Sequence, residues 1–180
     1  MKFAFLSDPL AHFKTYKDTT YAMMREAARR GHELYAFEPQ DMALELGKVV
    51  AKVRRVHLTG DAHAWYQFED AQDCLLSSFD AVLQRKDPPF DMEYLYSTYL
   101  LEMAENQGAR VFNKPSALRD QNEKLSIAQF SEFTAPTMVA RDMQRLTAFH
   151  ANHKDVIFKP LDGMGGTGIF RVGPDSLNLG

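Results

Sequence analysis

The chain has 180 residues, 45% of them hydrophobic and 25% charged, and its formal net charge is −3 at pH 7. This balance predicts a globular protein with a real core, and the lack of a basic excess argues against a nucleic-acid or membrane-surface binder. A lone cysteine, Cys74, permits no internal disulfide, and no apolar run reaches the length of a signal peptide or a membrane helix, so we expect a cytoplasmic protein.

The first 37 residues predict a strand, a helix and a second strand. Residues 2–7 and 32–37 are apolar runs of strand length. Between them, Asp18 and Thr19 can cap a helix that ends at Gly31, because glycine readily adopts the left-handed C-cap conformation. The strand–helix–strand order favours a parallel sheet.

The same α/β pattern continues to about residue 120. An amphipathic helix is expected at 92–107, and further strands are expected at 48–59, 79–83 and 109–113. We therefore predict an α/β fold with a mostly parallel sheet for residues 1–120.

The character of the sequence changes near residue 120. Residues 121–180 predict a separate lobe, with helices at 123–133 and 143–153 and strands at 137–140, 156–159 and 169–172. His150 and His153 are expected on the polar side of the second helix, in contact with water rather than with a metal.

A glycine-rich loop at 163–168 is the most informative segment. It fits the pattern G-x-G-x-x-G, but strand-forming residues follow it where a dinucleotide fingerprint needs a helix, and no Walker Gly-Lys-Ser/Thr is present. A glycine turn between two strands can close over nucleotide phosphates, because glycine lets backbone N–H groups approach closely. A plain hairpin turn is the alternative. Lys159 precedes the loop, and the order of lysine then glycine flap is that of ATP-grasp enzymes.

Several strings of sequence together resemble bacterial glutathione synthetase. The most specific are Arg-Lys-Asp-Pro-Pro-Phe-Asp at 85–91 and Lys-Pro-Leu-Asp-Gly-Met-Gly-Gly at 159–166. Shorter matches lie at 17–23, 113–115 and 118–125. The resemblance runs over essentially the whole chain.

This resemblance implies a Rossmann-like, pre-ATP-grasp domain over 1–120 and the first, incomplete part of an α+β ATP-grasp lobe over 121–180. Family members are homo-oligomers that join gamma-glutamylcysteine to glycine through an acyl phosphate, with ATP as a substrate that becomes ADP and phosphate. The Mg²⁺ ligands of such an enzyme would lie beyond residue 180. We therefore expect the 180-residue chain to be inactive by itself.

The resemblance also implies roles for individual residues. Lys124 and Lys159 would reach ATP, and the loop Gly163, Met164, Gly165 and Gly166 would cover its phosphates. Most lysines are solvated, so Lys124 also has that plainer interpretation.

Arg85 is a candidate for binding a peptide carboxylate, because it follows a buried strand at the edge where open α/β sheets bind ligands. A structural salt bridge with Asp87 is its alternative. Asp18 and Thr19 are weaker substrate candidates, since a helix cap explains them equally well.

Two other functions remain open on the sequence. One is a noncatalytic nucleotide- or peptide-binding module, and the other is an ATP-grasp ligase that joins a different acid and amine.

Overall fold

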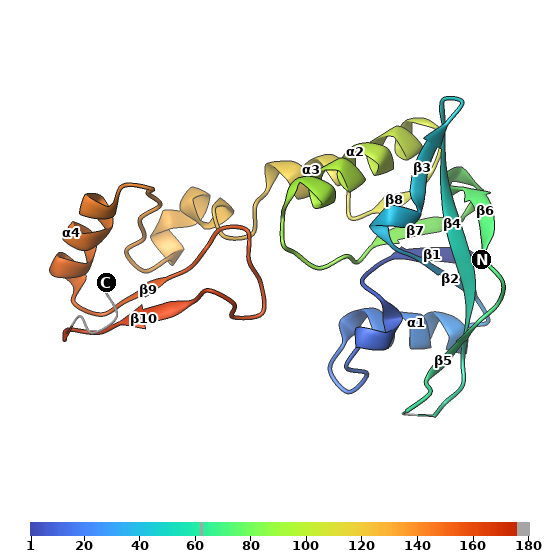
Figure 1. Cartoon of the computed structure of the whole chain (residues 1–180), viewed down its shortest axis with the longest axis horizontal. Coiled ribbons are helices and arrows are strands. Elements are labelled where there is room, and N and C mark those ends of the chain that lie inside the picture. The colour runs from blue at the N-terminus through green and yellow to red at the C-terminus, as the bar shows by residue number, and fades with distance from the viewer. Residues whose placement is uncertain (62, 176–180) are drawn as a thin grey trace. The chain divides into compact units, whose positions relative to one another are not determined.

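The computed structural model describes residues 1–61 and 63–175, and the chain forms two compact units. The first unit comprises Met1–Asp87 and Asp91–Arg119, and the second comprises Pro88–Phe90 and the chain from Asp120 onward. Figure 1 shows both units, each of which is described by itself below.

The first unit is built on a mixed sheet in the order β3-β4-β2-β1-β7-β8 (Figure 1). Four neighbouring strands are parallel: β2 (Glu33–Phe37), β1 (Lys2–Leu6), β7 (Ala81–Gln84) and β8 (Val111–Phe112). The long strand β4 (Lys48–Leu58) joins them antiparallel to β2. It also pairs antiparallel with β3 (Met42–Glu45), β5 (Tyr66–Phe68) and β6 (Gln72–Leu75). The predicted α/β fold is confirmed, and the strands around β4 make the sheet mixed.

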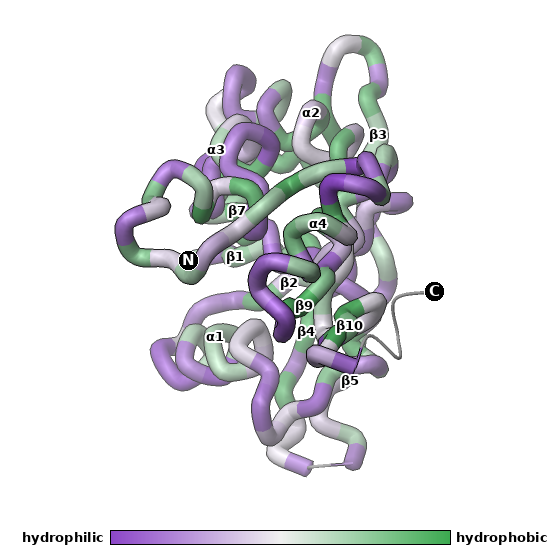
Figure 2. Tube along the Cα trace, turned by 90° about the vertical axis from the view of Figure 1, so that its left-hand side faces the viewer, coloured by the Kyte–Doolittle hydropathy of each residue, from purple (hydrophilic) through white to green (hydrophobic). Residues whose placement is uncertain are grey.

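Helices cover both faces of this sheet. Successive residues of a strand point to opposite faces, so Phe5 packs with Met24 of α1 (Thr19–Arg29), whereas Ala4 and Leu6 lie in the core that contains Leu101 of α2 (Met92–Asn106). Figure 2 shows hydrophobic and hydrophilic residues alternating along α1, as expected of a helix with one buried side.

The ends of α1 follow the sequence prediction. The Asp18 carboxylate accepts a hydrogen bond from the Tyr21 backbone N–H at 2.9 Å, and Gly31 has a φ of 77° just after the helix. The short helices η1 (Leu10–His12), η2 (Pro39–Asp41), η3 (Leu76–Ser78) and α3 (Pro115–Asp120) were not expected from the sequence.

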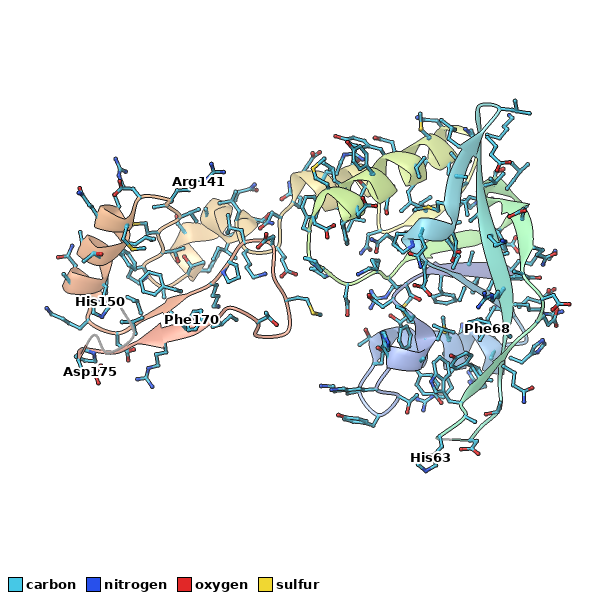
Figure 3. The ribbon with its side chains drawn as sticks, viewed as in Figure 1. His63, Phe68, Arg141, His150, Phe170 and Asp175 are labelled. Atoms are coloured by element: carbon cyan, nitrogen blue, oxygen red, sulfur yellow. The ribbon has the colours of Figure 1, made fainter. Side chains whose placement is uncertain are left out.

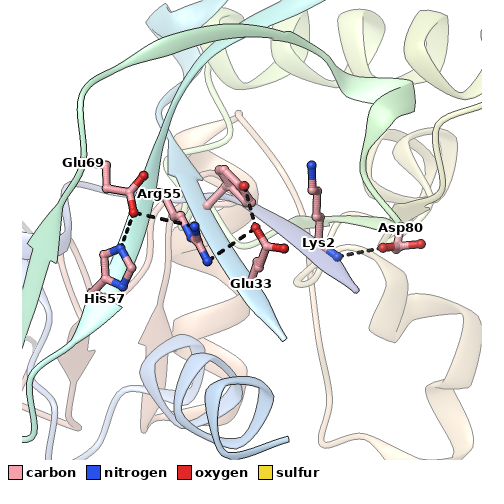
Figure 4. A network of polar contacts seen from close by, with 7 residues as sticks. Lys2, Glu33, Arg55, His57, Glu69 and Asp80 are labelled. Carbon is pink, nitrogen blue, oxygen red and sulfur yellow. Dashed lines mark hydrogen bonds and ion pairs between the residues drawn. The ribbon is translucent and has the colours of Figure 1, made fainter. Parts of the chain in front are cut away.

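A network of charged side chains crosses the surface of the sheet (Figure 4). Arg55 on β4 lies 3.5 Å from a carboxylate oxygen of Glu33 on β2 and 3.7 Å from one of Glu69, which also contacts His57 at 2.5 Å. These groups are partly exposed, so the network contributes little to the free energy of unfolding.

The second unit contains η4 (Ser126–Phe133), α4 (Met143–His153) and an antiparallel hairpin of β9 (Val156–Phe158) and β10 (Phe170–Val172). The helix predicted at 123–133 is a 3-10 helix kinked at Phe130. The strand predicted at 137–140 is wrong: these residues have no regular structure and are mostly exposed. A strand needs a hydrogen-bonding neighbour, and the described residues supply none there.

The expectation for His150 is also wrong. Its side chain is 4% exposed, lies between α4 and the hairpin (Figure 3), and its ring Nε2 is 2.9 Å from the Gly173 carbonyl oxygen. That hydrogen bond offsets the cost of burying the imidazole. His153 remains exposed, as predicted. Among the described residues, no helix is long and apolar enough to span a membrane.

The core under α2 offers a test of the first unit. Leu101 is fully buried and Met103, on the same helix, is 42% exposed. We expect Leu101→Ala to lower the free energy of unfolding by roughly 2–5 kcal/mol, because it leaves a cavity. Met103→Ala should cost within about 1 kcal/mol. The measurement is denaturant unfolding followed by fluorescence of Trp65, the single tryptophan, which is buried in the first unit. Equal losses would contradict this assignment of the core.

Candidate functional site

The carboxyl ends of β1 and β7 bring two predicted segments together. Because these strands are adjacent and parallel, Asp8 after β1 lies beside the residues that follow β7. The Arg85 backbone N–H donates to the Leu6 carbonyl at 2.7 Å, and the Asp87 N–H donates to the Asp8 carboxylate at 2.9 Å.

Arg85 points to the start of α1. Its Nη2 donates to the Thr19 hydroxyl at 2.8 Å and its Nε donates to the buried Thr20 hydroxyl at 3.0 Å. Two of the predicted residues, Arg85 and Thr19, are therefore in contact. Hydroxyl groups position the guanidinium without neutralising it, so its charge is available to an anionic ligand.

The other substrate candidate, Asp18, caps α1 with one of its carboxylate oxygens. No ion pair joins Arg85 to Asp87 among the described residues, where Arg85 bonds the two threonines instead. Thr20 was not predicted from the sequence, although its place in the first turn of a helix that follows the carboxyl end of β1 was a usable signal.

Acidic groups surround this edge. Lys86 and Asp8 form an ion pair at 2.9 Å. Partial loss of water raises the pKa of Asp87, and the nearby carboxylates of Asp8 and Asp18 raise it further, against the opposing charges of Arg85 and Lys86. Asp8 and Lys86 were also missed by the sequence analysis, and only their positions at the two strand ends pointed to them.

The glycine loop of the second unit borders a hollow of about 280 Å³. The hollow is lined by Glu123, Lys124, Pro160, Gly163, Met164, Gly165, Gly166, Thr167 and Ile169. Five of the six residues predicted to contact ATP line this hollow, and the sixth, Lys159, does not.

Lys124 is held directly against the loop. Its Nζ donates to the Gly163 carbonyl oxygen and pairs with Glu123 at 2.6 Å. Asn122 supports this arrangement: its side-chain oxygen accepts from the Lys124 backbone N–H at 3.0 Å, and its side-chain nitrogen donates to the Leu161 carbonyl at 3.2 Å. Asn122 was not selected from the sequence. Lys124 is thus mostly covered, unlike an ordinary solvated lysine.

Lys159 differs from Lys124. It follows β9, is exposed, and forms no hydrogen bond or ion pair with any described residue. It is not part of the wall of the hollow. Its ammonium group is available to a ligand, and a ligand contact for it remains a prediction.

The glycines of the loop are needed for their backbone conformation. Gly165 and Gly166 have φ values of 65° and 85°, and a Cβ added to either would meet nothing within 4 Å. A side chain is disfavoured there by the left-handed backbone rather than by crowding. The loop leads into a strand, as predicted, so its N–H groups belong to a turn and not to a helix N-terminus.

Metal ligands are not gathered in this part of the protein. Within residues 1–61 and 63–175, no three His, Cys, Asp or Glu side chains lie close enough together to hold a metal ion.

Comparison with known families identifies the family of the chain. The model of the prokaryotic glutathione synthetase N-terminal domain matches residues 1–119, and the model of the ATP-grasp domain of the same enzyme matches residues 123–180. The chain belongs to the prokaryotic glutathione synthetase family.

Individual relatives agree with this family. A glutathione synthetase of Ralstonia nicotianae is 61% identical over 180 residues, covering 100% of this chain and 56% of the relative. That of Nitrosomonas europaea is 52% identical over 184 residues, covering 100% of this chain and 57% of the relative. The chain thus spans a little over half the length of these glutathione synthetases.

A solved structure shares the fold. The ATP-grasp ligase PsnB, complexed with a phosphomimetic variant of its minimal precursor, Mg and ADP, is similar with a TM-score of 0.52 and 20% identity. The match covers 98% of this chain and 58% of that chain. At this identity the likeness concerns the fold alone, which is the α/β fold predicted for this synthetase-family chain.

The acidic edge near Arg85 yields a prediction about pH. Asp87 should titrate above the ordinary aspartate pKa, and Asp8→Asn should lower its pKa because a neighbouring negative charge is lost. Carbon-13 NMR of the carboxyl groups measures both values. The exposed loop residue Asp70, changed to Asn, is the control and should leave Asp87 unaffected.

The direction of the effect on stability follows from this shift. A raised pKa favours protonated Asp87 in the folded protein, so its contribution is present below the ordinary carboxyl pKa and is lost as the pH rises through the raised value. An Asp87 pKa that does not respond to Asp8→Asn would disprove the coupling.

Proposed function

We propose that this protein is a glutathione synthase, which ligates gamma-glutamylcysteine to glycine with ATP through an acyl phosphate, giving ADP and phosphate. The observation that carries the proposal is the 61% identity to a glutathione synthetase over all 180 residues. The position of Lys124 against the glycine loop supports it independently, because a cation beside a turn rich in backbone N–H groups suits a polyphosphate.

The two units would then have different functions in the ligase. Residues 1–120 form the substrate-binding, pre-ATP-grasp domain, and 121–180 form the first part of the ATP-grasp domain. We propose that Arg85 binds a carboxylate of the peptide with its guanidinium fork and that Thr19 holds the fork in place. Asp18 contributes by starting the helix that carries Thr19 and Thr20.

The chemistry explains why cations are needed. The peptide carboxylate attacks the gamma-phosphorus of ATP, and both partners are anionic, so repulsion must be offset before the bond can form. Lys124, Lys159 and the N–H groups of Gly163, Met164, Gly165 and Gly166 would supply positive charge around the phosphates. The glycine amine then displaces phosphate from the acyl phosphate, from which water must be kept away.

Further properties of the whole enzyme belong to the proposal. We infer that it works in the cytoplasm as a homo-oligomer and that Mg²⁺ accompanies ATP. By the resemblance to the family, the residues that would hold the ion lie beyond residue 180.

The activity is tested by comparing two proteins. The product of the complete gene should form glutathione from gamma-glutamylcysteine, glycine and ATP, and the 180-residue chain should form none. The reason is that ATP with its charge only partly neutralised is a poor electrophile. Glutathione is measured by chromatography and ADP by a coupled assay. Turnover by the short chain would refute its inactivity. ATP binding without turnover by the gene product would favour a noncatalytic module, and product formation only with another acid or amine would favour a different ligase.

The roles of the lysines are tested by ATP titration calorimetry on the product of the complete gene. Lys124→Ala and Lys159→Ala should each weaken ATP binding by roughly 1.5–3 kcal/mol, because each removes a charge-assisted contact. Lys154→Ala, which removes an exposed lysine at the end of α4, should change it by no more than about 0.5 kcal/mol. If all three variants bind ATP as tightly as the unsubstituted protein does, neither Lys124 nor Lys159 contacts the nucleotide.

The loop can be tested in the same titration. Gly165→Val or Gly166→Val should impair ATP binding, because a branched side chain strains a backbone with positive φ and holds it away from the phosphates. Thermal unfolding measured in parallel separates this effect from loss of folding. Unchanged ATP affinity would indicate that the loop is a plain hairpin turn with no role in ATP binding.

A further inference from the structure

A second hollow lies in the first unit, on the face of the sheet that α1 covers. Its volume is about 290 Å³, near the lower limit for small-molecule pockets. Ala36 on β2 is opposite Arg54 on β4 in the sheet register, so the two side chains share one face, and the short alanine leaves space beside the long arginine. The hollow also borders η2 and the aromatic strand β5.

The cations of this hollow are unpaired. Lys52 and Arg54 are two residues apart on β4 and therefore point to the same side of the sheet. Both residues are exposed, and neither side chain forms a hydrogen bond or ion pair with another described residue. The guanidinium carbon of Arg54 lies 5.4 Å from the ring centre of Phe68, within the distance of a cation–π contact; Figure 3 labels Phe68. A contact with the ring uses none of the N–H donors of the guanidinium, so they are available for a planar carboxylate.

Carboxylates at the N-cap and at the last residue of η2 complete the polar lining. Asp41 accepts one hydrogen bond from the Glu38 backbone N–H at 2.8 Å, and the Glu38 carboxylate accepts one from Gln40 at 2.8 Å. A carboxylate has about four lone-pair sites, so both retain acceptor capacity. No ion pair links these acids to Lys52 or Arg54 within the described part of the chain. The hollow therefore presents positively and negatively charged side chains that are not paired with one another.

We propose that this hollow binds the α-amino carboxylate head of an amino acid or a small peptide. The carboxylate of the ligand lies against Arg54 and Lys52, and its ammonium group lies against Glu38 and Asp41. A ligand with a single charge satisfies only one half of the lining and leaves the other half desolvated without a partner, which costs free energy. The small volume limits the part of the ligand that is enclosed to about one amino-acid residue.

This recognition does not depend on the proposed ligase activity, since it involves neither ATP nor the glycine loop. Asp8 lies both on the edge of the hollow and in the cluster around Arg85, so the hollow adjoins the candidate substrate site. Two sources of the same chemistry are therefore relevant: a peptide that takes part in the reaction, and a free amino acid.

Calorimetry without ATP, on the product of the complete gene, tests the proposal. The probes are glycine, gamma-glutamylcysteine and glutathione, with acetate and ethylammonium as ligands of one charge. We expect at least one zwitterion to bind and both single-charge ligands to bind at least tenfold more weakly. Binding of glycine identifies a free amino acid as the ligand, and binding of the peptides alone identifies a reaction participant; either result supports the proposal.

Variants locate the binding. Arg54→Gln and Glu38→Gln should each weaken it at least tenfold, whereas Lys48→Gln, which removes an exposed cation of the same strand outside the hollow, should not. Thermal unfolding followed by Trp65 fluorescence checks the fold, and Lys52→Gln replaces Arg54→Gln if the latter is unfolded.

Three results would overturn the proposal: no zwitterion binds, acetate binds equally well, or binding is lost in Arg85→Gln and kept in Arg54→Gln. The last result places the ligand at the Arg85 cluster and leaves the proposed function standing. Loss of glutathione formation with retained zwitterion binding would affect the proposed function alone.

Discussion

Parallel pairing of β1 with β7 is the constraint on which the candidate substrate site depends. Two parallel neighbours end at the same edge of a sheet, so the residues that follow them meet although they are far apart in the sequence. Asp8 meets Lys86 and the backbone of Asp87 for this reason. The same edge receives the first turn of α1, whose threonine hydroxyls orient the arginine.

The interactions around Arg85 hold its guanidinium in position without neutralising its charge. Threonine hydroxyls hold the guanidinium by neutral hydrogen bonds, and the nearby Asp8 is instead paired with Lys86. A binding group for an anion must keep its charge uncompensated until the ligand arrives, because a buried internal ion pair would have to be broken first. Lys124 is different, since it already contacts Glu123 and a loop carbonyl. An anionic ligand at the loop would compete with those contacts, and under the proposed function Lys124 would then couple ligand binding to the loop conformation.

The second unit buries few side chains. Val156, Val172 and His150 are its buried residues within the described range, and large apolar side chains such as Phe133 and Met143 are exposed. Its order therefore rests on local hydrogen bonds: the cap of α4, the β9–β10 pairing, and the bonds of Asn122 and His150. A small unit held in this way has little hydrophobic stabilisation of its own.

Features that depend on neighbours in the chain were determined by the sequence alone. Asp18 and Gly31 mark the two ends of α1, as predicted. Helix α4 spans the predicted residues 143–153. The predicted apolar or alternating runs form the strands β1, β2 and β4. The long strings at 85–91 and 159–166 identified the family, which the comparisons confirmed. Propensity, capping and alternation act within a few residues, and a family string is itself a local pattern.

Features that depend on partners distant in the chain were decided only by the tertiary structure. The antiparallel place of β4, the bonds from Arg85 to Thr19 and Thr20, and the support of Lys124 by Asn122 each need a chain path that periodicity does not specify. Residues 137–140 have strand-forming composition but no strand to pair with, so they remain irregular. His150 has a polar side chain and is nevertheless buried, because the carbonyl of Gly173 accepts its hydrogen bond. Burial and strand pairing require two segments in contact, and the sequence of one segment does not specify the other.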